Sequence, residues 1–193
     1  MDIARKIVRL CVTMGADINL HRGDGKTVLY YAIEARSRYF VAAILEMSPR
    51  LNLIVDSSYT FMHKAVLCGS PDIIVLIFDH SSTAILEKRD LYNGNTFLHD
   101  LIQQRQEAVL HHVLRSDKVD YAVRICDNRG RTPLMCAALQ PNPSTAIIVS
   151  LMSRCESLTY VHAVSDIKSD ERDEKLLLAK QVISREITKN SQL

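Results

Sequence analysis

The sequence predicts an all-α protein assembled from repeated helix-turn-helix units, and three observations lead to this prediction. A short block built around a threonine occurs four times, and an apolar run of helical length follows each block. A further apolar run, with its own Gly-Ala-Asp-Ile-Asn ending, precedes the first block. The chain has 193 residues, of which 47% are hydrophobic, so it has enough apolar surface for the core of such an array.

The four blocks align without gaps around their threonines. They are Gly25–Ala32, Ser58–Ala65, Gly94–Leu101 and Gly130–Ala137. Their threonines, at positions 27, 60, 96 and 132, lie 33, 36 and 36 residues apart. A period of this length is typical of stacked supersecondary units. Threonine suits the start of a helix because its hydroxyl accepts a hydrogen bond from an unpaired backbone N–H, and Pro133 suits the first turn.

The second helix of each unit is predicted from the apolar run that follows its block. The runs are Phe40–Leu45, Ile73–Phe78, Val109–Leu114 and Ile147–Met152. In the fourth unit the run begins later, because Pro141–Pro143 lengthens the turn between the two helices. Upstream, Ile7–Val12 and the following Gly15–Asn19 fit the second half of one more unit. The array therefore begins in the middle of a repeat.

These blocks resemble the ankyrin family, whose unit reads approximately D-x-x-G-x-T-P-L-H-x-A, then a second helix, then G-A-D-V-N. The best matches are Gly15–Asn19, Asn95–His99 and Asp127–Leu134. The resemblance implies an ankyrin-repeat solenoid of stacked helix-turn-helix units with β-hairpin loops. It also implies that His63 and His99 tie neighbouring loops together by hydrogen bonds. Tyr30 and Met135 replace this histidine, and Leu101 replaces the family alanine.

The predicted organisation has three parts. Residues 1–21 form an N-terminal half repeat, residues 22–155 form an array of about four units, and residues 156–193 contain a degenerate cap, an acidic loop and a C-terminal helix. The half repeat would expose Ile3, Ile7 and Leu10, because terminal units normally need a polar outer face. We expect an excised fragment or short gene, dimerisation through this open face, or a partner packed on it.

Composition excludes several classes of function. The net charge is +2 with 24% charged residues and no basic stripe, so we expect no nucleic-acid partner. No apolar run approaches the ~20 residues that cross a bilayer, so we expect no membrane association. The five cysteines are odd in number and widely spread. This pattern predicts a reducing, intracellular location, cytoplasmic or nuclear.

Catalytic and metal-binding motifs are absent from the sequence. No phosphate-binding loop, serine nucleophile elbow or H-E-x-x-H helix occurs. His111 and His112 are adjacent on a predicted helix, so they point about 100° apart and do not form the i, i+4 pair of a zinc site. We therefore expect no catalytic residues, no metal and no cofactor, and we do not expect an enzyme.

The predicted function is that of a non-catalytic protein-protein interaction module. In the proteins that the sequence resembles, partners contact the hairpin tips and the exposed, concave face of the first helices. The candidate binding residues in this register are Asp56, Tyr59, Tyr92, Asn93, Asn95, Gln103, Gln104, Asn128, Arg129 and Arg131. Further candidates on the same elements include Asp90, Cys68 and Leu139. Tyrosine and arginine are the residue types that most often dominate interfaces.

One motif in the sequence bears on the identity of the partner. Asn95–His99 and the irregular repeat spacing resemble the ankyrin domains of NF-κB inhibitors, including short viral proteins similar to them. This resemblance implies a Rel-type transcription factor as the partner, sequestered from DNA. The absence of an Asp-Ser-Gly degron agrees with a constitutive inhibitor and equally with an unrelated ankyrin protein. The alternative is a targeting fragment of a larger regulatory or enzyme complex.

Overall fold

The chain is mostly helical in the computed structural model, which describes residues 2–21, 23, 25–56 and 58–154. The all-α prediction is therefore confirmed. The first helix of each unit is α2 (Val28–Glu34), α4 (Phe61–Cys68), α7 (Phe97–Gln103) and α9 (Pro133–Ala138). The second helices are α1 (Asp2–Thr13), α3 (Arg38–Leu45), α5 (Pro71–His80), α8 (Glu107–Val113) and α10 (Thr145–Arg154).

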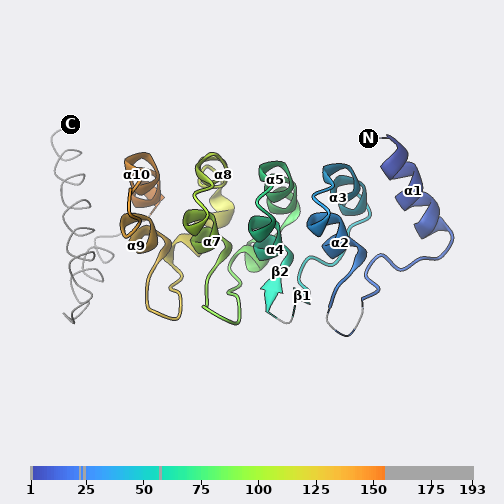
Figure 1. Cartoon of the computed structure of the whole chain (residues 1–193), viewed down its shortest axis with the longest axis horizontal. Helices are drawn as coiled ribbons and strands as arrows, with labels where there is room; N and C mark the ends of the chain where they lie inside the picture. Colours follow the sequence, from blue (N-terminus) through green and yellow to red (C-terminus); the bar gives the residue numbers. More distant parts are fainter. Residues whose placement is uncertain (1, 22, 24, 57, 155–193) are drawn as a thin grey trace.

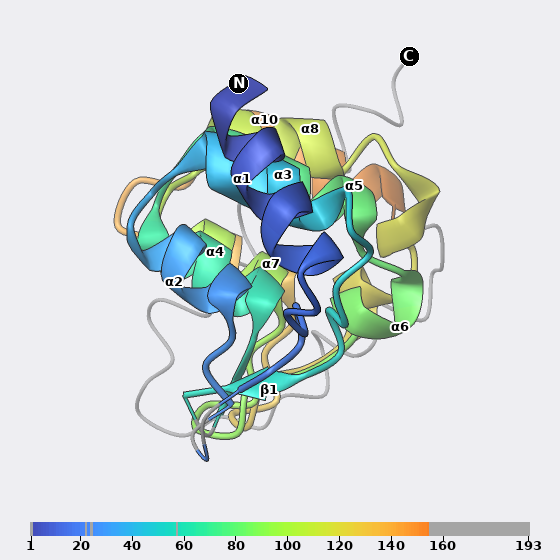
Figure 2. The same ribbon diagram turned by 90° about the vertical axis from the view of Figure 1, so that its right-hand side faces the viewer.

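The helices stack in two rows, as Figure 1 shows. In the first row α2 contacts α4, α4 contacts α7, and α7 contacts α9. In the second row α1, α3, α5, α8 and α10 each contact the next helix in that order. The end-on view in Figure 2 places the two rows side by side. Each helix pair therefore also buries apolar faces against its neighbours along the row.

The loops that precede the first-row helices extend to the same side of the two rows (Figure 1). One of them contains a two-stranded antiparallel ladder of β1 (Ile54–Val55) and β2 (Tyr59–Thr60). Within the described residues the two strands pair in this loop, so the predicted β-hairpin is formed here. Side-chain hydrogen bonds close the next two loops. Short helices connect the second row to the loops: α6 (Thr83–Leu86), η1 (Asp117–Val119) and η2 (Ala122–Arg124).

Threonine starts the first-row helices as predicted. The hydroxyls of Thr27, Thr60 and Thr132 each accept a hydrogen bond from the backbone N–H three residues later. Pro133 occupies the first turn of α9, where its missing N–H leaves no hydrogen bond unmade. The position of each loop relative to its helix is therefore fixed by local capping.

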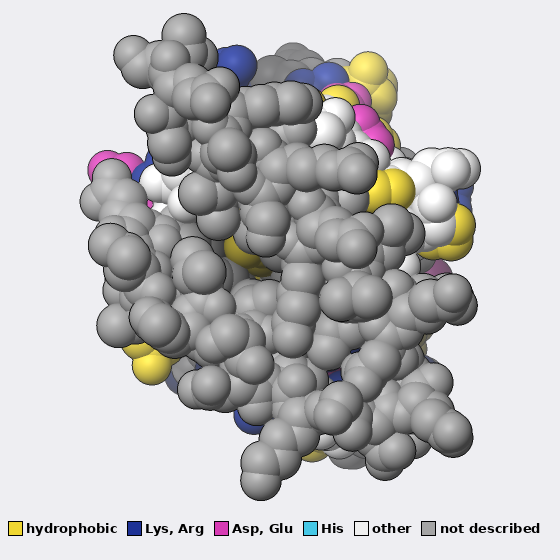
Figure 3. Space-filling model, turned by 90° about the vertical axis from the view of Figure 1, so that its left-hand side faces the viewer, with side chains coloured by type: hydrophobic (Ala, Val, Ile, Leu, Met, Phe, Trp, Pro, Cys, Tyr) yellow, Lys and Arg dark blue, Asp and Glu magenta, His cyan; other side chains and the backbone are white. Residues whose placement is uncertain are grey.

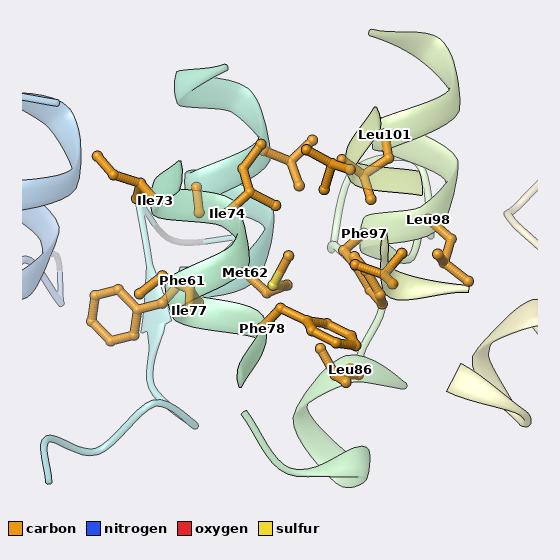
Figure 4. Packing of buried hydrophobic residues seen from close by; sticks show 14 of the residues in the cluster. Phe61, Met62, Ile73, Ile74, Ile77, Phe78, Leu86, Phe97, Leu98 and Leu101 are labelled. Atoms are coloured by element: carbon orange, nitrogen blue, oxygen red, sulfur yellow. The ribbon is translucent and has the colours of Figure 1, made fainter. Parts of the chain in front are cut away.

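The core lies between successive units. Figure 4 shows side chains from α4 and α5 pointing toward those of α7. Met62 and Leu98 are fully buried, and the rings of Phe78 and Phe97 lie 6.1 Å apart between centroids. Leu134 has an equivalent place in the fourth unit and is 2% exposed. The stacked helices are therefore joined by continuous apolar packing.

The N-terminal helix packs on one side only. α1 contacts α3 and buries Ala4 and Val8 in the common core. Its other face exposes apolar side chains, among them Ile3, Ile7 and Leu10, as the sequence predicted. Ile3 is 75% and Leu10 is 63% exposed.

The fourth unit has the longer turn that the sequence predicted. Residues 139–144, which include Pro141–Pro143, separate α9 from α10, whereas residues 104–106 separate α7 from α8. Residues 155–193 are drawn in grey in Figures 1 and 3. The predicted degenerate cap, acidic loop and helix at Glu174–Ile187 lie outside the described residues.

A lysine of the third unit caps a helix of the second. Lys118 Nζ donates hydrogen bonds to the carbonyl oxygens of Phe78, Asp79 and Ser81 at the end of α5, at 3.5, 2.9 and 3.2 Å. A cation at this end also interacts favourably with the helix dipole. Lys118→Met keeps the apolar stem and removes the ammonium group, so we expect the free energy of unfolding to fall by about 1–2 kcal/mol.

Urea unfolding of the Lys118→Met variant measures this loss. The matched control is Lys88→Met, since Lys88 Nζ donates an exposed hydrogen bond to the carbonyl oxygen of Asn52 at 3.2 Å. We expect the control to lose less than about 0.5 kcal/mol. Equal losses in the two variants would show that the contact with α5 adds no stability.

Candidate functional site

A buried aspartate organises the loop before α7. Asp90 Oδ1 accepts hydrogen bonds from the backbone N–H groups of Tyr92 and Asn93 at 2.7 and 2.8 Å. Its Oδ2 accepts from the N–H of Asn95 at 2.7 Å. The backbone N–H of Asp90 also donates to the carbonyl oxygen of Asn95, at 2.8 Å. These bonds hold the loop closed and place the Tyr92 side chain outside it, 62% exposed.

A second aspartate organises the loop before α9 in the same way. Asp127 Oδ1 accepts hydrogen bonds from the backbone N–H groups of Arg129 and Arg131 at 2.8 and 2.9 Å. Its Oδ2 contacts the guanidinium of Arg131, with Nε at 2.8 Å and Nη2 at 2.6 Å. Burial raises the pKa of Asp127, but the hydrogen bonds from Arg131 and Arg129 outweigh burial and hold its pKa below the ordinary value.

Hydrogen bonds join these two loops to each other. The backbone N–H of Asn128 donates to the carbonyl oxygen of Asn93 at 2.8 Å, and its side-chain amide donates to that of Tyr92 at 3.3 Å. Arg89 donates to the carbonyl oxygen of Gly94 at 2.8 Å and to Asn128 Oδ1 at 2.5 Å. The loop tips of the third and fourth units therefore form one connected surface.

Two buried histidines tie each loop to the preceding first-row helix, as the resemblance implied. The N–H of Thr60 donates to His63 Nδ1, so Nε2 carries the proton and donates to the carbonyl oxygen of Asn95 at 3.0 Å. His99 Nε2 makes the equivalent bond to the carbonyl oxygen of Arg131 at 2.9 Å. Burial lowers the pKa of both histidines, which favours this neutral form.

Most of the predicted binding residues surround one groove. It lies between the third and fourth units and has a volume of about 460 Å³. It is lined by Tyr92, Asn93, Asn95, Gln103, Asp127, Asn128, Arg129, Arg131, Cys136, Leu139 and Gln140. Asp56, Tyr59 and Gln104 are predicted residues outside this lining. Seven of the ten binding residues predicted from the repeat register therefore line this groove.

Asn95, one of the predicted binding residues, is buried. Asn95 is 3% exposed, because its backbone is held by Asp90 and His63 and its Nδ2 donates to Asp100 Oδ1 at 2.9 Å. Asp90, the further candidate, is also buried, at 4% exposed. Within the described part of the chain, Asn95 Oδ1 and Asp100 Oδ2 have no hydrogen-bond partner. Asn95 is one of the residues that line the groove, but its Oδ1 is buried and not open to the groove.

Asp56 belongs to a polar network between the first two units. It is half-buried, and the Tyr30 hydroxyl donates to its Oδ2 at 2.6 Å. Lys64 Nζ donates to the Tyr30 hydroxyl at 2.9 Å, and Lys26 Nζ lies 3.1 Å from Asp56 Oδ1. The hydrogen bond from Tyr30 is the main cause that lowers the pKa of Asp56. Neither lysine was predicted from the sequence, although Lys26 aligns with the candidates Tyr59, Asn95 and Arg131, each directly before its threonine.

Two tyrosines link this network to the groove. The rings of Tyr59 and Tyr92 lie 5.7 Å apart between centroids in a tilted arrangement. Tyr59 is half-buried and packs against the apolar core. Gln103, the last residue of α7, and Gln104, its C-cap residue, are both exposed. Tyr59 and Tyr92 thus form an aromatic pair between neighbouring loops.

The described residues contain no cluster of three or more His, Cys, Asp or Glu side chains placed to hold a metal ion. Their helices include none with the length and apolar character needed to span a bilayer.

Comparison with known proteins adds one result. A scan against protein-family models and a search of curated proteins found no match. Among solved structures, the chain is similar to a chain in the complex of the predatory endopeptidase Bd0816 from Bdellovibrio bacteriovorus with the immunity protein Bd3460. The TM-score is 0.64 at 16% identity, covering 96% of this chain and 91% of that chain. In all, 264 solved chains match, so the likeness indicates a widely used fold and selects no function.

Proposed function

We propose that the chain is an ankyrin-repeat protein that binds another protein through its loop tips and first-row helices and has no catalytic activity. The assignment to ankyrin repeats is supported by the Thr-x-x-His capping of α4 and α7 and by the two rows of stacked helices. The observation that carries the binding role is the groove, whose lining contains seven candidates identified from the repeat register.

The loops have the physical properties of a binding surface. Asp90 and Asp127 hold the loop backbones with short hydrogen bonds, so little conformational entropy would be lost when a partner binds. Tyr92 and Arg129 are exposed at the tips of these loops. Both residue types offer a large contact area with a polar end. A rigid platform with such side chains favours protein recognition.

The candidate partner that the sequence motif favours is a Rel-type transcription factor. The motif is Asn95–His99, and its histidine makes the bond to the next loop that this kind of repeat requires. We propose a reducing compartment, cytoplasmic or nuclear, for this encounter, since Cys11, Cys68, Cys126 and Cys136 are unpaired. The role of a targeting fragment in a larger complex is the other outcome of the test below.

The test replaces Tyr59, Tyr92 and Arg129 together by alanine. We expect at least about a tenfold loss of affinity for Rel protein in co-precipitation, because an interface of standard size spans several neighbouring loops. The same variant should fail to compete with κB-site DNA for the Rel protein. Helical circular dichroism and the thermal unfolding curve establish that the variant is folded, which matters because Tyr59 touches the core.

The matched control replaces Tyr39, Tyr121 and Arg115, which are exposed and lie outside the groove. We expect this control to bind as the wild type does. If folded wild-type protein retains no Rel protein at micromolar concentration, the Rel assignment is wrong. If a bound partner is retained equally by the Tyr59, Tyr92, Arg129 variant, the proposed binding surface is wrong.

A further inference from the structure

We propose that the groove between the third and fourth units recognises an acidic segment of the partner protein, with a carboxylate placed on Arg129 and Arg131. This inference rests on the proposed function, because it names the chemistry of the segment that the same surface binds. It follows from the hydrogen-bonding capacity that the groove residues leave unused.

The groove wall offers donors and almost no free negative charge. Besides two arginines, its lining contains the side-chain amides of Asn93, Gln103 and Gln140. Among the described lining residues Asp127 is the one carboxylate, and both of its oxygens accept hydrogen bonds from Arg129 and Arg131. A ligand with an exposed anionic acceptor therefore complements this wall, whereas a cationic ligand finds no free carboxylate on its described residues.

The two arginines differ in how their guanidinium groups are held. The Arg131 guanidinium is half-buried and fixed by Nε and Nη2 on Asp127, so its orientation is set before a ligand arrives. The Arg129 side chain is exposed, and within the described residues it makes no hydrogen bond or ion pair. A guanidinium that is fixed beside one that is free to close on a ligand suits the capture of a carboxylate.

The volume of the groove agrees with a segment and not with a whole folded face. About 460 Å³ lies within the range of cavities that bury a small ligand, so a few side chains of an extended peptide fill it. The flanking Tyr92 ring supplies an apolar wall beside the charged end. We therefore expect an acidic residue next to an apolar one in the bound segment.

The experiment selects twelve-residue random peptides, displayed on phage, against the full-length protein. The expected result is enrichment of sequences with aspartate or glutamate beside an apolar residue. One enriched peptide is then synthesised, and its affinity is measured by fluorescence anisotropy. Arg129→Gln is expected to weaken binding by about tenfold, and replacing the acidic residue of the peptide by its amide should cause a similar loss.

Arg115→Gln is the matched control, since Arg115 is an exposed arginine outside the groove, and it should leave the affinity unchanged. Arg129 lies on an exposed loop, so its replacement is not expected to unfold the protein. Basic or neutral selected peptides, an unchanged affinity of the Arg129→Gln variant, or no enrichment at all would each overturn this inference. The proposed function is decided separately, by whether the Tyr59, Tyr92, Arg129 variant loses its protein partner.

Discussion

Leu98→Ala is expected to lower the free energy of unfolding by about 2–5 kcal/mol. Leu98 lies on α7, is fully buried, and belongs to the apolar layer between units that Figure 4 shows. The substitution removes buried methyl groups and leaves a cavity, because helices held on both sides by neighbouring units cannot close the space completely. Leu134→Ala, on α9, should cause a loss in the same range.

Urea unfolding, followed by circular dichroism, measures both losses. The control is Arg129→Ala, which changes an exposed side chain at a loop tip and should cost less than about 0.5 kcal/mol. The slope of the free energy with urea must stay constant for the comparison to hold. Equal losses in the two leucine variants and the arginine variant would mean that the apolar layer between units does not stabilise the stack.

The stacking of the helices could be predicted because each step depends on short-range patterns. A threonine starts the helix, a leucine or methionine two residues later faces the next unit, and the apolar run of the second helix follows at a fixed distance. These patterns recur, so four weak signals in register reinforce one another. The same alignment placed the first-row helices side by side and gathered most binding candidates at one groove.

Burial of individual loop side chains could not be predicted in this way. Tyr59, Asn95 and Arg131 all precede the helix-starting threonine, yet Asn95 alone is buried. The difference arises because the Asn95 side chain donates a hydrogen bond to Asp100. In the neighbouring units the position of Asp100 is occupied by Lys64 and Cys136. An asparagine just before the threonine, with an aspartate four residues after that threonine, was the available signal.

The two loop aspartates were harder to interpret from sequence. Asp90 stands six residues before its threonine and Asp127 five, so simple alignment does not equate them. In the structure both accept backbone N–H groups two and three or four residues later, which is the hydrogen bonding of an Asx turn. Asp90 was expected to contact a partner, but it is buried because its carboxylate accepts hydrogen bonds from the loop backbone. Charge on a loop therefore does not by itself indicate a binding residue.

Asp100→Asn is expected to stabilise the protein at neutral pH, and this prediction depends on its buried carboxyl. Burial raises the pKa of Asp100 from 3.8 to about 6, the hydrogen bond from Asn95 opposes this shift, and the negative charge of Asp90 adds to it. Asp100 Oδ2 has no hydrogen-bond partner among the described residues, so the ionised form has little compensation for its lost solvation.

The sign of the pH dependence follows from the raised pKa. Between about pH 4 and pH 6 the folded state keeps a proton that the unfolded state has released, so stability falls as the pH rises through this window. The amide variant does not titrate and keeps an oxygen for the hydrogen bond from Asn95 Nδ2. Its advantage over the wild type should therefore grow by about 2 kcal/mol between pH 4.5 and pH 8.

Urea unfolding of both proteins at about pH 4.5, 6 and 8 measures this difference. His63 and His99 have lowered pKa values, so their contribution is present above about pH 6.5 and is lost as the pH falls. Both proteins contain these histidines, and subtracting one stability profile from the other removes their effect. A difference that stays constant across the three pH values would show that Asp100 is ionised without cost in the folded protein, and that its environment is better solvated than its burial implies.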